Sequence, residues 1–118
     1  MLKLAIVLFL AAVICGFFLL TAILQDRPVN QKVKALHGVF AGLGLLIMIV
    51  HMLTFMSGQS SLLIASLIIL IVAALGGLTL VMLARKGKPL PKLAVIVHPI
   101  IAIAGLIALI IYVKFLQD

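Results

Sequence analysis

The sequence of 118 residues has very few acidic side chains and almost no cysteine. It contains no glutamate, and its two aspartates are Asp26, expected in a loop, and Asp118, at the end of the chain. Catalysis by a pair of carboxylates is therefore excluded. The single cysteine, Cys15, excludes an intramolecular disulfide and a cysteine–histidine zinc cluster. No glycine-rich phosphate-binding loop precedes a lysine, which also removes this class of nucleotide-binding protein.

Charged residues make up only 9% of the chain, whereas 67% of the residues are hydrophobic. The mean hydropathy is +1.53. A soluble domain of this size could not bury so much apolar surface, because small domains keep a large surface that is mostly polar. The composition therefore predicts an integral membrane protein that contacts the lipid bilayer, with residues 1–118 forming one bundle.

Four apolar runs are long enough to cross a hydrocarbon core of about 30 Å. They predict transmembrane helices at residues 2–24, 33–56, 62–84 and 93–116. The first run is interpreted as a retained helix, because no A-x-A cleavage pattern follows it. Short connections make sequential helices antiparallel neighbours, so the expected fold class is an all-α, integral membrane four-helix bundle.

The nine basic residues, with a formal net charge of +7, lie mostly in two short connections between apolar runs. In these places they set membrane orientation and meet anionic lipid headgroups, so no nucleic-acid binding is expected. Because positive loops stay in the cytoplasm, loops 25–34 and 85–92 are predicted to be cytoplasmic and both termini to lie on the opposite side. A bacterial inner membrane is the expected location.

An internal repeat with an offset of 61 residues divides the chain into two halves, 1–57 and 62–118. Leucine and alanine matches mean little in so apolar a chain, but rarer residue types also coincide. These matches are Gly16 with Gly77, Pro28 with Pro89, His37 with His98, and Gly44 with Gly105. The repeat predicts two helical hairpins related by a pseudo-two-fold axis along the membrane normal.

Under this repeat, His37 and His98 lie at equal depth on two parallel helices. A two-fold axis between the hairpins would bring their imidazoles face to face, in the arrangement of the axial ligands of a haem iron. Four nearby glycines lack side-chain bulk and would let a flat macrocycle approach the backbone. These glycines are Gly38, Gly42, Gly44 and Gly105.

His51 follows His37 by fourteen residues, so the two rings face the same side of one helix about 21 Å apart. The repeat partner of His51 is Tyr112. A second centre there would use His51, with Tyr112 either as a ligand or as a hydrogen-bonding neighbour. The expected cofactor is therefore haem b, with one haem at His37 and His98, and a second only if His51 also binds.

The H-x13-H spacing, together with a histidine at like depth on another helix, resembles the four-helix membrane cytochromes b. The resemblance covers the second and fourth predicted helices. It implies haem ligation by His37, His98 and His51, and electron transfer within or across the membrane, with a quinone or a partner subunit as redox partner. The chain departs from the family pattern at Tyr112. The resemblance implies an electron carrier or an oxidoreductase subunit rather than a stand-alone enzyme.

Other functions fit parts of the pattern. A chlorophyll-type magnesium takes one axial histidine, so the three histidines would also suit a small pigment-binding subunit. A structural subunit of a larger membrane complex would use them as polar packing groups. A small multidrug-type transporter is disfavoured, because such proteins depend on a membrane-embedded glutamate. The small-residue faces with Gly16, Gly76 and Gly77 would support a homodimer.

Overall fold

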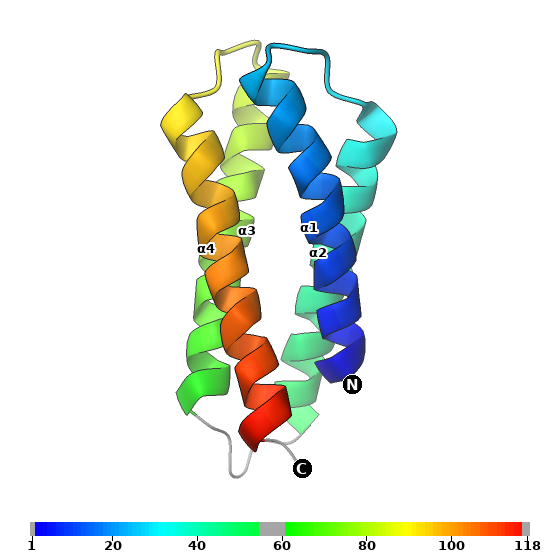
Figure 1. Ribbon diagram of the computed structural model, residues 1–118, viewed down its shortest axis with the longest axis vertical. Helices are drawn as coiled ribbons and strands as arrows, with labels where there is room; N and C mark the ends of the chain where they lie inside the picture. Colours follow the sequence, from blue (N-terminus) through cyan, green and yellow to red (C-terminus); the bar gives the residue numbers. More distant parts are fainter. Residues whose placement is uncertain (1, 55–60, 117–118) are drawn as a thin grey trace.

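The computed structural model describes residues 2–54 and 61–116. Its elements are α1 (Leu2–Leu24), α2 (Gln31–Thr54), α3 (Ser61–Arg85), α4 (Lys92–Ile111) and a π-helical extension of α4, η1 (Tyr112–Leu116). The four long helices stand side by side (Figure 1), and each is long and apolar enough to span a membrane. The protein is an all-α integral membrane protein, which confirms the predicted fold class.

The helix boundaries differ from the predicted spans by a few residues. The largest shift is at the start of α2, which begins at Gln31 because the side chain of Asn30 caps it. The Asn30 Oδ1 atom accepts hydrogen bonds from the amides of Lys32 at 2.9 Å and Val33 at 3.3 Å. The cap extends the helix into the polar residues before the apolar run. Residues 55 and 56 of the predicted second span lie outside the described residues.

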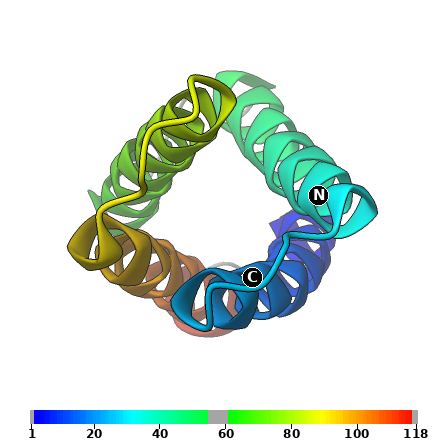
Figure 2. The ribbon, with the colours of Figure 1, turned by 90° about the horizontal axis from the view of Figure 1, so that it is seen from above.

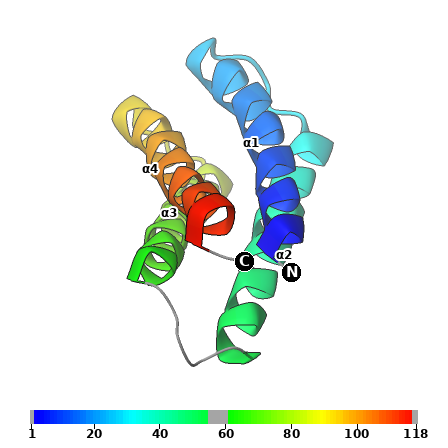
Figure 3. The same cartoon turned by 60° about the horizontal axis from the view of Figure 1, so that its bottom comes forward.

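The helices form two antiparallel hairpins, α1 with α2 and α3 with α4, which are visible as two pairs in Figure 3. Seen along the bundle, the helices occupy the corners of a square in chain order (Figure 2). The two hairpins contact each other where α1 packs against α4 and where α2 packs against α3. Helices α2 and α4 are diagonally opposite, as are α1 and α3. The connections at residues 25–30 and 86–91 lie at the same end of the bundle.

The same turn ends the first helix of each hairpin. Asp26 after α1 and Gly87 after α3 have positive φ angles of 56° and 71°, and they occupy equivalent positions of the repeat. The following amides bond back into the last helical turn, Arg27 N to Ala22 O at 2.8 Å and Lys88 N to Leu83 O at 3.1 Å. This Schellman arrangement satisfies carbonyls that the helix end would leave unpaired.

Burial follows the repeat as well. Six buried positions of the first hairpin have a buried counterpart 61 residues later: Leu2 and Leu63, Ala5 and Ser66, Phe9 and Leu70, Ala12 and Ala73, Gly44 and Gly105, Met48 and Leu109. The Ser66 hydroxyl donates to the carbonyl of Gly105 at 2.8 Å, which satisfies this buried polar group between α3 and α4. The two hairpins therefore present corresponding faces to the interior.

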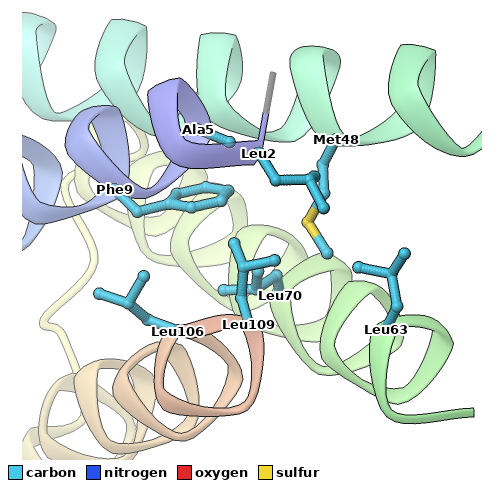
Figure 4. Close-up of a cluster of buried hydrophobic side chains, with 8 residues drawn as sticks. All are labelled: Leu2, Ala5, Phe9, Met48, Leu63, Leu70, Leu106 and Leu109. Atoms are coloured by element: carbon cyan, nitrogen blue, oxygen red, sulfur yellow. The ribbon is translucent and has the colours of Figure 1, made fainter. Parts of the chain in front are cut away.

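Large side chains fill the half of the interior away from the two connections (Figure 4). Leu2, Met48, Leu63 and Leu109 are at most 1% exposed, and Phe9 and Leu70 pack against them. Many other apolar side chains point outward, such as Phe17 at 63% exposed and Leu93 at 75%. Such an apolar exterior suits contact with lipid rather than water.

Gly44 generates a prediction, because it lets α1 approach α2. A Cβ atom there would lie 2.7 Å from Cε1 of Phe9, whereas a Cβ atom on Gly42 would meet no atom within 4 Å. We expect Gly44→Ala to destabilise the protein by about 1–3 kcal/mol through overpacking, and Gly42→Ala to have little effect. Thermal unfolding in detergent compares the two variants. Equal melting temperatures would contradict the packing described here.

Candidate functional site

His37 and His98 meet in the interior of the bundle. Their ring centroids are 6.3 Å apart, and the ring planes are inclined at 81°. His37 lies on α2 and His98 on α4, the diagonally opposite helices, so the pair bridges the two hairpins. The structure thus brings together the two histidines that the repeat relates.

Each imidazole lies against a glycine of its own hairpin. A Cβ atom on Gly16 of α1 would lie 3.0 Å from Cε1 of His37, and one on Gly77 of α3 would lie 2.9 Å from Cε1 of His98. The two contacts are equivalent under the repeat. Gly16 and Gly77 thus pack against histidine rings of the same chain, and a homodimer through the small-residue faces with Gly16, Gly76 and Gly77 stays a prediction.

A hydrogen bond fixes the orientation of His37. Its Nδ1 lies 2.7 Å from the carbonyl oxygen of Ala12, one turn from Gly16 on α1. A carbonyl only accepts hydrogen bonds, so Nδ1 carries the proton and Nε2 keeps a lone pair. Metal-binding histidines use this arrangement, in which one nitrogen donates to a carbonyl and the other coordinates the metal.

His98 differs from His37 in this respect. The repeat places Ala73 where Ala12 lies in the first hairpin, and the Ala73 backbone interacts with His98. However, Nδ1 of His98 is buried, and its approach to the Ala73 backbone does not have the geometry of a hydrogen bond like that of His37 to Ala12. A buried polar atom of this kind is costly in a membrane interior unless a bound group or a small movement satisfies it.

The spacing of the two rings suits a shared metal. Two imidazoles on opposite sides of one metal, each bound at about 2.0–2.1 Å through a nitrogen that points at it, have centroids about 6.3–6.5 Å apart, because each centroid lies about 1.15 Å beyond its nitrogen. The observed separation is 6.3 Å. The inclined ring planes are compatible with this, since two imidazoles on opposite sides of one metal need not be parallel.

Small residues surround the histidines on the other two helices. Ala12 and Ala73 are each 4% exposed, and Gly16 and Gly77 follow them by one turn. Gly16 lies about 10 Å closer to the connections than Phe9, which belongs to the filled part of the core. The interior therefore has a bulky half and a small-residue half, and the histidine pair lies in the second.

The four glycines predicted to border a macrocycle have other surroundings. The Phe9 ring occupies the space beside Gly44. The Leu70 side chain occupies the space beside Gly105, and its Cγ would lie 2.8 Å from a Cβ atom there. Gly38 and Gly42 are exposed, with no atom within 4 Å of an added Cβ. Two of these glycines thus serve helix packing, and two lie on the outside of the bundle.

The surroundings of His51 and Tyr112 differ from those of the first pair. His51 lies in the last turn of α2, and Tyr112 begins η1, where it packs against the apolar core. His51 and Tyr112 lie fourteen residues after His37 and His98. In the antiparallel partner helices, the same level is reached fourteen residues before Gly16 on α1 and Gly77 on α3, at Leu2 and Leu63. Both leucines are 1% exposed, so large side chains replace the glycines here.

Sequence reasoning did not identify Ala12, Gly16, Ala73 and Gly77 as neighbours of the site. The sequence nevertheless contains a signal for these neighbours, because Gly16 and His37 lie equally far from the turn at residues 26 and 27. In an antiparallel hairpin such positions face each other. The repeat transfers the same relation to Gly77 and His98.

Comparisons with known proteins identify no relative. No protein family, no curated protein and no solved structure matches this chain. The site must therefore be interpreted from its own residues.

The hydrogen bond to Ala12 predicts the tautomer of His37. In protein produced without haem, ¹⁵N NMR of labelled histidine should show His37 with a protonated Nδ1 and an unprotonated Nε2, with His37→Ala used for assignment. An Nε2-protonated His37 would mean that this nitrogen is not free to bind a metal in the ground state.

Proposed function

We propose that the protein is a b-type membrane cytochrome that binds one haem through His37 and His98 and carries electrons. The observation that supports this most is the separation of 6.3 Å between two imidazoles across the bundle interior. The His37 hydrogen bond, which leaves Nε2 available, adds to it. When bound, the haem would supply one-electron redox chemistry.

A haem suits this pair better than a bare metal ion does. Among residues 2–54 and 61–116, no group of three or more histidine, cysteine or acidic side chains lies together. A metal ion held only by protein would thus have two ligands here, whereas structural and catalytic zinc sites use three or four. A porphyrin supplies four nitrogens in a plane and leaves two axial positions for the histidines.

The meeting of the histidines also favours haem over a chlorophyll-type pigment. One axial histidine is enough for such a magnesium, so pigment sites would not require two rings at metal-sharing distance. A purely structural role would not require the two imidazoles to meet at a distance that one metal can share. We therefore rank the pigment-binding and structural functions below the cytochrome.

We propose one haem rather than two. Leu2 and Leu63 fill the interior at the level of His51 and Tyr112, so the small-residue surroundings of the first pair are not repeated there. Electrons would enter and leave through a quinone or a partner subunit near the end of the bundle that carries the two connections. His37 and His98 each lie six residues into their helices from this end, about 9 Å along the axis.

We further propose that this end faces the cytoplasm. Both connections lie there, and seven of the nine basic residues lie in them or in the adjoining helix ends: Arg27, Lys32, Lys34, Arg85, Lys86, Lys88 and Lys92. Such an asymmetry is typical of the cytoplasmic side of a bacterial inner membrane.

The haem proposal predicts the absorption spectrum. Protein purified in mild detergent with haem supplied should show a sharp Soret band that shifts on reduction with dithionite, together with split bands in the green. His37→Ala and His98→Ala should each lose the low-spin spectrum, because each removes one axial ligand. His51→Ala is the matched control and should retain it, with one haem per chain.

Two outcomes would contradict the proposal. A protein that stays colourless when haem is supplied would exclude the cytochrome function. Loss of the low-spin spectrum in His51→Ala but not in His98→Ala would show that different residues bind the haem.

The orientation predicts which end an impermeant thiol reagent can reach. In a Cys15→Ala background, Lys88→Cys should be labelled in inverted membrane vesicles and protected in intact cells. Lys3→Cys, exposed at the other end, should show the reverse. Labelling of Lys88→Cys in intact cells would place the basic end outside.

A further inference from the structure

Lys34 is unusual among the basic residues of the described chain. It is the one lysine or arginine that is partly buried, whereas the other eight are exposed. Its counterpart in the second hairpin is Val95, which is 3% exposed and belongs to the interior face of α4. Lys34 therefore occupies a register position that the repeat directs toward the interior.

Lys34 is also close to the histidine site. It precedes His37 by three residues on α2, so both side chains lie on one helix face. The rise between them is about 4.5 Å, with Lys34 on the side of the connections. Lys34 thus lies one turn from His37 on the same helix face, at the connection end of the small-residue half of the bundle.

The described chain supplies no carboxylate for this charge inside the bundle. Its single acidic residue is Asp26, which is exposed at the turn that ends α1. The Lys34 residue is partly buried, and an ammonium without a counter-charge is unfavourable in an apolar environment. The arrangement suits a bound anion that approaches from the interior side.

We propose that Lys34 binds a carboxylate of the haem, so that the acidic edge of the macrocycle points toward the connections. This inference rests on the proposed haem site. Haem b carries two carboxylates on one edge, and an ammonium one turn from an axial histidine is placed to form a charge-assisted hydrogen bond with one of them. Lys34 is thereby a positioning residue that selects one orientation of an otherwise nearly symmetric ring.

The test compares haem with its dimethyl ester, in which both carboxylates are uncharged. We expect esterification to weaken binding to the unaltered protein by about tenfold or more, the loss of one hydrogen bond to a charged group. Lys34→Met should bind both compounds equally, at the weaker level. All four combinations should keep the low-spin spectrum, because His37 and His98 are unchanged.

Two further variants separate this role from a general charge effect. Lys32→Met removes a neighbouring exposed lysine and should keep the full ester penalty. Lys34→Arg keeps the charge and should also retain most of the penalty. Both variants should also give the same low-spin spectrum as the unaltered protein, which would show that the substitutions leave the bundle folded.

The alternative is that Lys34 only extends its ammonium to the membrane surface while its aliphatic stem covers apolar side chains. In that case esterification would weaken haem binding to the same degree in the unaltered protein and in Lys34→Met. This result would overturn the role assigned to Lys34 but not the proposed haem site. Failure of the unaltered protein to form a low-spin haem complex would overturn the proposed function and the assignment together.

Discussion

The contact of an imidazole ring with a glycine, made once in each hairpin, is the constraint on which the interior of this protein depends. His37 lies on Gly16 and His98 on Gly77, and a Cβ atom at either glycine would come within 3.0 Å of the ring. The glycine lets a polar ring lie between two helices instead of facing lipid. Because both hairpins repeat the contact on diagonally opposite sides, the rings meet at 6.3 Å.

Polar groups inside a membrane protein must find partners, and most of those described here do so within the chain. The hydroxyls of Thr21 and Thr79 bond to carbonyls of their own helices, Ser66 bonds across to α4, and His37 bonds to Ala12. Each of these groups is satisfied by structure alone. His98, with its buried Nδ1, is different, so the site joins one firmly oriented ring to one whose orientation is held less firmly.

The sequence predicted the parts of the structure that depend on composition and spacing. Long apolar runs gave the four spans, the offset of 61 gave the two hairpins, and equal depth paired His37 with His98. It did not show that Gly38 and Gly42 lie on the outside of the bundle, because the rotation of each helix decides which glycine faces inward. In a chain that is apolar on all sides, the hydrophobic pattern does not reveal this rotation. The start of α2 was missed because the Asn30 cap acts outside the apolar run.

The most direct test of the proposed haem site is electron paramagnetic resonance of the oxidised, haem-loaded protein. Two imidazoles on one iron with planes inclined at 81° leave two iron d orbitals nearly equal in energy. The account therefore predicts a low-spin signal with one very large g value and its loss in His98→Ala. A high-spin signal from the unaltered protein, or a low-spin signal that survives His98→Ala, would contradict the claim that His37 and His98 hold one haem between them.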